Sequence, residues 1–99
     1  MAIMEISVIP LGTKSPSVSK YVAIALKELK KQRKVKYSLT AMGTIVEGDL
    51  DILLEVAKKM HRSVLKKEIK RVVTTIKIDE RVDKRMASKG KINSVKKKI

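Results

Sequence analysis

A chain of 99 residues with 43% hydrophobic residues suffices for one domain with a modest core, and no cysteine is present to form disulfides or a reactive thiolate. Aromatic residues are limited to two tyrosines, so the core must be built from Ile, Val, Leu and Met. The formal net charge of +14 predicts attraction to anions in general, nucleic acid included, and carries no sequence recognition.

The start of the chain and its hydrophobic runs indicate neither export nor membrane insertion. No apolar run approaches the length of a membrane span, and the first five residues lack the basic start of a secretory signal. We therefore expect a cytoplasmic protein with no membrane partner. The richness in Lys and Ile, with few thermolabile residues, is typical of hyperthermophile proteins.

The first half of the chain opens with a strand and a helix. Alternating residues predict a strand over residues 3–9, which Pro10 breaks. Ser15 as N-cap and Pro16 at the first helical position predict a helix start. Apolar residues at helical spacing carry that helix to about Gln32.

Two short strands and a second helix follow. The pattern predicts strands over residues 36–42 and 44–47, paired antiparallel and joined by a turn or bulge at Gly43. Asp49 is the expected N-cap of a helix with an apolar stripe through Val64. Residues 71–78, rich in Val, Thr and Ile, predict a fourth strand.

The order β-α-β-β-α-β is the split-βαβ, or ferredoxin-like, pattern of the α+β class. It predicts a four-stranded antiparallel sheet with two helices on one face, in a single domain over residues 1–99. Residues 79–99 form a charged C-terminal extension, in which we expect a short helix near 91–98 that begins after an interruption at Gly90. That helix would pack on the domain or be swapped onto a neighbour.

Nothing obvious covers the second face of the predicted sheet. A polar open face is compatible with solvation, with a second chain or with a ligand. The expected open-face residues are Ser7, Ser38, Thr40, Thr75 and Lys77, together with either Thr44 or Glu47.

Glu47 is the one acid inside an otherwise apolar strand. An ionised carboxylate is costly to bury without a partner. Glu47 therefore either accepts hydrogen bonds from an amino-heterocycle or is a surface residue, solvated or paired with a lysine such as Lys77.

The segment Gly12-Thr13-Lys14-Ser15 lacks the spacing and residue order of a phosphate loop. Backbone N–H groups at the start of a helix can still hold an anion. The simpler alternative is a turn at Gly12 and a cap at Ser15.

Catalysis and nucleic-acid binding have less support. His61 is the lone histidine, and it lacks the partners that a metal site or a catalytic pair needs. We interpret it as a helix-surface or boundary residue. We therefore expect that the protein is not an enzyme. RNA-recognition modules share the topology but stack bases on aromatics of the two central strands. We expect the central strands here to be residues 3–9 and 71–78, and neither contains an aromatic residue.

Three segments, residues 5–13, 42–48 and 74–81, resemble the small thiamine-binding protein family, in order and with the family's spacing. The Met-Gly-Thr-Ile-Val-Glu-Gly segment at 42–48 is the most specific part. The resemblance implies a ferredoxin-like fold, dimers paired through their sheets, and homotetramers built as dimers of dimers. It also implies binding of thiamine, or of its hydroxymethylpyrimidine half, without a cofactor and without chemical transformation.

The candidate site combines the resemblance with sheet geometry. The resemblance implies Thr44 and Glu47 first; the sheet face and the helix start contribute four hydroxyls; and Met42 could pack on the ring in place of an aromatic residue. The candidate ligand-binding residues are Glu47, Thr44, Thr13, Ser7, Thr40, Thr75 and Met42.

The charge of the chain bears on the choice of ligand. Thiamine carries a cationic thiazolium ring, which a net charge of +14 would repel at long range. A thiamine phosphate, or the pyrimidine alone, would suit the charge better. We expect carriage, storage or sensing of such a ligand, the alternatives being charge-driven nucleic-acid binding and a purely structural oligomerisation module.

Overall fold

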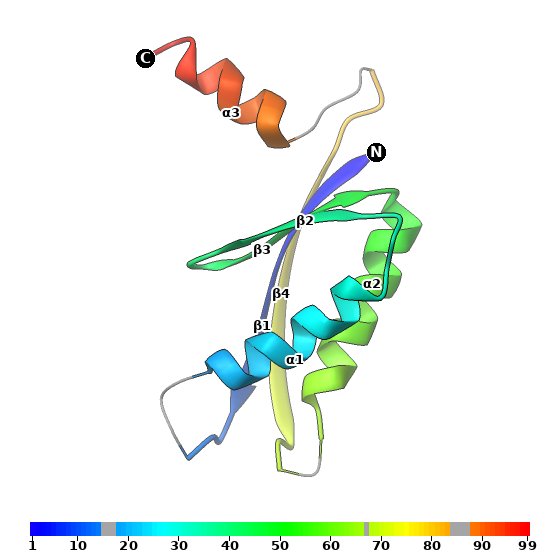
Figure 1. Ribbon diagram of the computed structural model, residues 1–99, viewed down its shortest axis with the longest axis vertical. Helices are drawn as coiled ribbons and strands as arrows, with labels where there is room; N and C mark the ends of the chain where they lie inside the picture. Colours follow the sequence, from blue (N-terminus) through cyan, green and yellow to red (C-terminus); the bar gives the residue numbers. More distant parts are fainter. Residues whose placement is uncertain (15–17, 67, 84–87) are drawn as a thin grey trace.

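The computed structural model describes residues 1–14, 18–66, 68–83 and 88–99. Four strands and two helices follow one another in the order predicted, a third helix lies at the C-terminus, and the fold is ferredoxin-like α+β (Figure 1). The elements are β1 (Ala2–Leu11), α1 (Ser19–Lys30), β2 (Lys36–Thr40), β3 (Gly43–Gly48), α2 (Leu50–Val64), β4 (Arg71–Glu80) and α3 (Ser88–Lys96).

The sheet is antiparallel, with the strand order β2-β3-β1-β4. The inner strands are therefore β1 and β3, and the expectation that the first and last strands are central was wrong. The crossover through α2 returns the chain to the free side of β1, which makes β4 an edge strand. β3 contains no aromatic residue, and neither does β1, so the base-stacking arrangement of RNA-recognition modules is not present on these strands.

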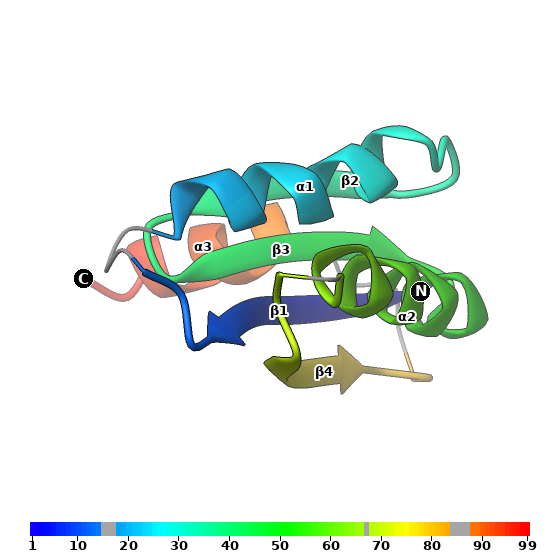
Figure 2. The same cartoon turned by 90° about the horizontal axis from the view of Figure 1, so that it is seen from below.

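The core lies between one face of the sheet and the helices α1 and α2. In Figure 2, α1 lies toward β2 and α2 toward β1 and β4. The buried side chains are aliphatic, as predicted, because β1 turns alternate residues inward and the helices meet them with Leu29 and Leu53. Full burial of one such leucine stabilises the fold by about 2 kcal/mol.

Several strand bounds differ from the sequence prediction, and two of these differences have a visible cause. β1 runs through Pro10 to Leu11 instead of breaking there. Pairing of β1 with β3 ends at Ile6, so the missing N–H of Pro10 removes no ladder bond on that side. β2 ends at Thr40 because its hydroxyl closes the turn, donating to the Gly43 carbonyl at 2.7 Å and accepting from the Met42 N–H at 3.3 Å.

The helix starts are set differently in α1 and α2. Asp49 is the N-cap of α2, as predicted, in an extended conformation with φ −69° and ψ 142°. α1 begins at Ser19 after Val18, and it ends at Lys30, short of Gln32. The predicted cap at Ser15 and Pro16 lies outside the described residues.

α3 includes Gly90, so the expected interruption there was wrong and the helix starts earlier than residue 91. It stands at one end of the molecule, clear of α1 and α2 (Figure 1). The Lys91 ammonium pairs with the Asp79 carboxylate at the end of β4. Ile92 and Val95 are 53% and 60% exposed, so this helix presents apolar side chains to solvent.

The open face of the sheet is less polar than predicted. Ile9 and Val73, directly opposite each other on β1 and β4, are 46% and 45% exposed, and Leu11 extends this apolar strip. Ser7 and Thr75 are also directly opposite each other on this face. The face is thus a mixture of aliphatic and hydroxyl side chains.

Candidate functional site

A pocket opens between the first half of α1 and the turn that joins β2 to β3. Its volume is about 280 Å³. Val22 and Leu26 of α1 form one wall, Ile6 and Val8 of β1 form the floor, and Leu39 of β2 lies at the side. None of the described residues that line this pocket carries a charge.

Thr44 is the buried polar residue at this pocket. The register pairs Thr44 with Ile6, so its side chain points toward the helices, and only 4% of the residue is exposed. Among the described residues, no buried side-chain nitrogen or oxygen lacks a hydrogen-bond partner, so the Thr44 hydroxyl is not an orphaned buried group. As a lining residue of the pocket, Thr44 can offer a ligand either a donor or an acceptor.

Gly43 explains how the wall beside Thr44 can be so close to β1. A Cβ at this position would lie 3.1 Å from the backbone oxygen of Ile6. Any side chain would push the β2–β3 turn away from β1, where the pocket opens. Met42, next in the turn, is 85% exposed and stands at the rim.

Ser7 and Thr40 also line the pocket, but their hydroxyls do not serve it in the same way. Ser7 alternates with the buried Ile6 and Val8, so its side chain faces the open side of the sheet. The Thr40 hydroxyl is engaged in the turn. The structure therefore brings Ser7, Thr40, Met42 and Thr44 together, with Thr44 as the principal polar group.

Glu47 lies on the opposite face of β3 from Thr44. The register places it across from Ile3 on β1 and Lys36 on β2, both on the open face. Of the two alternatives for that face, Glu47 is the one found there. Lys77 lies across from Glu5, on the far side of β1, so it is not the cross-strand neighbour of Glu47.

Thr13 and Thr75 belong to neither the pocket nor the surroundings of Glu47. Thr75 is on the open face opposite Ser7. Thr13 lines a separate depression at the loop end of the molecule, with Lys14, Lys20 and Tyr21. The predicted site residues are thus divided among three places in the fold. These are the pocket, the open sheet face with Glu47 and Thr75, and the loop end with Thr13.

His61 is a boundary residue, as predicted. It is partly buried on α2, and its Nδ1 lies 2.6 Å from the Thr74 hydroxyl of β4. In the described ranges, no three His, Asp or Glu side chains gather as a metal site would require. Those same ranges contain no helix with the length and apolar character to cross a membrane.

Sequence reasoning missed the apolar walls of the pocket. Val22, Leu26 and Leu39 were not among the predicted site residues, and Leu39 is 59% exposed. The helices do not fully cover β2, because it is the edge strand of the sheet. An apolar alternation on a strand at the sheet edge was the available signal, but the strand order was needed to interpret it.

Comparison with known proteins gives the family. The sequence model described as thiamine-binding protein matches residues 4–96. A UPF0045 protein of Methanothermobacter thermautotrophicus is 48% identical over 100 residues, covering 100% of both chains. A UPF0045 protein of Staphylococcus xylosus is 47% identical over 100 residues, covering 98% of this chain and 94% of that one.

Solved structures agree with this assignment. The crystal structure of a hypothetical protein from Methanocaldococcus jannaschii has a TM-score of 0.87 and 44% identity, covering 96% of this chain and 95% of that one. A putative thiamine biosynthesis/salvage protein from Thermotoga maritima has a TM-score of 0.79 over 95% of this chain and 97% of that one, and at 19% identity it supports the fold alone. The match across nearly the whole chain, with the ferredoxin-like fold, places this protein in the thiamine-binding protein family.

Proposed function

We propose that this protein binds thiamine or a related aminopyrimidine without transforming it, and that the pocket beneath the β2–β3 turn holds the pyrimidine ring. The observation that carries the proposal is the placement of Thr44, a polar residue that is only 4% exposed, in the lining of a mainly apolar and uncharged pocket. Membership of the family supports the class of ligand.

The pocket chemistry suits one neutral heterocycle. An aminopyrimidine offers ring nitrogens that accept and an exocyclic amine that donates, and a threonine hydroxyl can do either. The aliphatic walls would bury the ring, and the Met42 thioether at the rim could close over its face.

The size of the pocket limits how much of thiamine it can hold. Sites for drug-sized ligands have volumes of about 300–1,000 Å³. The pocket, at about 280 Å³, lies just below that range. The cationic thiazolium ring would therefore remain at the mouth in water, which avoids the cost of burying a charge among aliphatic groups.

A binding role fits this site better than catalysis. General acid or base catalysis needs a titratable group within reach of the substrate. The described residues that line the pocket include none. Carriage, storage or sensing of the ligand is the proposed role, with the cytoplasm as the proposed compartment.

We further propose that the protein works as a homo-oligomer, a dimer of dimers, paired through the open sheet face. Ile9, Leu11 and Val73 form an exposed apolar strip there, flanked by the paired hydroxyls of Ser7 and Thr75. Burial of such a strip against a second copy would remove it from water. The exposed Ile92 and Val95 of α3 offer a second apolar surface to the assembly.

Calorimetric titration tests the ligand. Thiamine, thiamine monophosphate and hydroxymethylpyrimidine would each be titrated in moderate salt, which suppresses non-specific charge effects. We expect a saturable heat with the free pyrimidine and with thiamine. Flat traces with all three would exclude the proposed function.

The roles of Thr44 and Glu47 are separated by one variant. Since Glu47 is on the open face, Glu47→Ala would be followed by calorimetry and by light scattering after size-exclusion chromatography. Loss of binding with an unchanged oligomer would place Glu47 at the ligand. A broken oligomer would instead place it at the contact between copies.

A further inference from the structure

A broad depression lies at the end of the molecule opposite α3, where the loop after β1 meets the loop before β4. It has a volume of about 660 Å³, and Ile69 lies at its base. A second hollow of about 460 Å³ shares Lys20, Tyr21 and Ile69 with it and adds Lys66. The two hollows form one surface, which we call the loop-end depression.

The charge of the loop-end depression is strongly positive. Lys14, Lys20 and Lys66 are exposed around it, and Glu68 is the one acid among the described residues that line it. In the described part of the chain, none of these lysines has a carboxylate within ion-pair distance. The first helical turn of α1, which forms one wall, contains no acid either.

Lysines elsewhere on the helices are placed differently. Lys31 pairs with Glu28 at 3.2 Å, and Lys58 pairs with Glu55 at 3.1 Å. Those ammonium groups are already partly neutralised by a neighbour on the same helix. No described carboxylate forms an ion pair with the lysines of the loop-end depression, so a bound anion would replace weakly held counterions.

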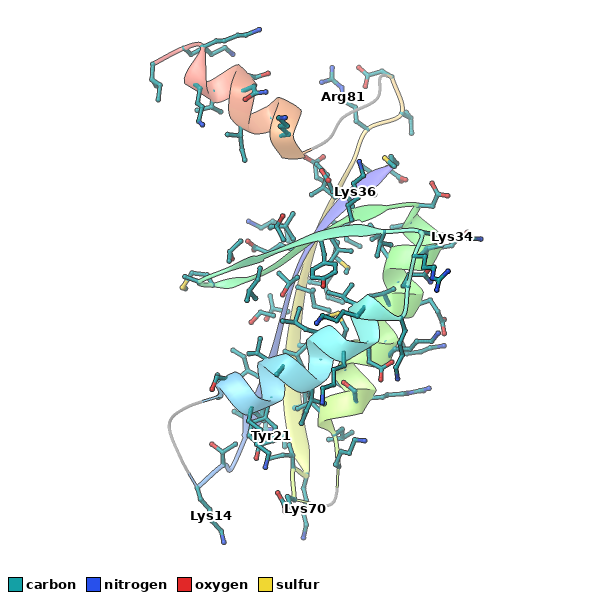
Figure 3. All side chains as sticks on the ribbon, in the orientation of Figure 1. Lys14, Tyr21, Lys34, Lys36, Lys70 and Arg81 are labelled. Carbon is teal, nitrogen blue, oxygen red and sulfur yellow. The ribbon has the colours of Figure 1, made fainter. Side chains whose placement is uncertain are left out.

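An aromatic ring accompanies these charges. Tyr21, one of two aromatic residues in the protein, is partly buried and lies between the two hollows. The Lys20 ammonium lies 5.7 Å from the centroid of its ring. Figure 3 shows Tyr21 at the start of α1, with Lys14 and Lys70 extending from the same end of the molecule.

The turn at Gly12 brings Lys14 to this surface. Gly12 has φ +79°, in the left-handed region that favours glycine. A Cβ at this position would meet nothing within 4 Å, so the backbone angle and not space selects glycine. The reversed chain places Thr13 and Lys14 beside the first turn of α1, as lining residues of the depression.

We propose that the loop-end depression binds a small organic phosphate with an aromatic group. The ammonium groups of Lys14, Lys20 and Lys66 hold the phosphate oxygens, and the Tyr21 ring lies along the aromatic part. This inference does not rest on the proposed function, because the pocket beneath the β2–β3 turn is a different, uncharged site. Glu68 lines both hollows, so it disfavours a continuous polyanion laid across them more than it disfavours a single phosphate.

Calorimetric titration of the full-length protein with adenosine monophosphate, adenosine and an oligothymidylate at moderate salt tests this. We expect the monophosphate to saturate and adenosine to bind far more weakly, because only the former carries the anion. Lys20→Ala should lower the affinity for the monophosphate by roughly three- to fivefold, as expected for loss of one exposed charge contact. Glu68→Gln should raise the same affinity by about twofold, since the substitution removes the repelling carboxylate.

Lys27→Ala is the matched control, since Lys27 is an exposed lysine of α1 outside the depression. It should leave the affinity for the monophosphate unchanged. Equal weakening by Lys20→Ala and Lys27→Ala would show general charge attraction and overturn the proposal. So would saturable binding of the oligothymidylate alone, with a salt dependence that grows with its length, because that is the behaviour of a site for a nucleic-acid backbone. Circular dichroism melting of each variant verifies that it folds.

Discussion

The pocket beneath the β2–β3 turn and the loop-end depression both border α1, yet they differ in almost every chemical respect. Val18 and Val22 of the α1 region face the pocket beneath the β2–β3 turn, which has no charged lining residue among those described. Lys20 and Tyr21, from the same turns, face the loop-end depression, where three lysines outnumber one glutamate. The helix thus divides an apolar site from a basic site within a few residues.

This difference shows that a net charge of +14 does not describe every site on the protein. The repulsion expected for a thiazolium cation acts at long range and is screened within a Debye length of about 8 Å at physiological salt. Inside the pocket, the decisive quantities are apolar walls and one hydroxyl. The ligand of each of the two sites is therefore set by local side chains, and each site can be changed without the other.

The largest effect should come from a charge placed in the apolar pocket. Val22→Glu would add a carboxylate to its wall, and binding of hydroxymethylpyrimidine should fall by about 30-fold or more, since a buried unpaired charge is costly. Ala23→Glu adds the same charge to the exposed side of α1 and should leave the affinity unchanged. Calorimetry compares the two; an equal loss in both would mean that the ring binds elsewhere.

Removal of the Thr44 hydroxyl should have the next largest effect. Thr44→Val keeps the shape and should weaken pyrimidine binding by about tenfold, the value of one buried hydrogen bond. The thermal midpoint should change little, because valine keeps the shape of the side chain. Thr75→Val, on the open face, is the control. Retention of full affinity by Thr44→Val would remove the proposed contact.

In the unmodified protein, the salt dependence of ligand binding should differ between the pocket beneath the β2–β3 turn and the loop-end depression. Raising sodium chloride from about 50 to about 500 mM shortens the Debye length several-fold. Binding of the neutral pyrimidine should change by less than about twofold, while binding of adenosine monophosphate should weaken by about five- to tenfold. Titrations at several salt concentrations measure both. Parallel losses would indicate that both ligands use the basic surface.

The smallest effect concerns the Glu55–Lys58 pair, which lies outside both the pocket and the loop-end depression. A hydrogen bond from Lys58, and its charge, lower the pKa of the Glu55 carboxyl from its ordinary value of 4.5. A carboxyl with a lowered folded-state pKa adds stability above its unfolded pKa and loses it as the pH falls through the folded value. The pair is fully solvent-exposed, so its contribution is small.

Melting curves of Glu55→Gln should therefore show a slight loss of thermal midpoint at neutral pH that fades as the pH falls below the ordinary carboxyl pKa of 4.5. The variant should bind adenosine monophosphate as the native protein does, since Glu55 is outside the loop-end depression. A larger loss in acid than at neutral pH would contradict the direction of the pKa shift.

The sequence by itself determined what depends on near neighbours in the chain. The order of strands and helices, the aliphatic core and the N-cap position of Asp49 follow from local sequence patterns, and the structure confirms them, although the Asp49 side chain makes no capping hydrogen bond. The segment at residues 42–48 likewise indicated the family before any fold was known, and the family match confirms it.

Only the tertiary structure decided which candidates share a site. Thr44 and Glu47 are close in sequence, but pairing with β1 turns the first toward the helices and the second toward the open face. Strand order made β4 an edge and left Leu39 exposed beside a pocket. These outcomes depend on the register and layering of segments that are far apart in the chain, and local patterns contain no information about which distant strand becomes the neighbour.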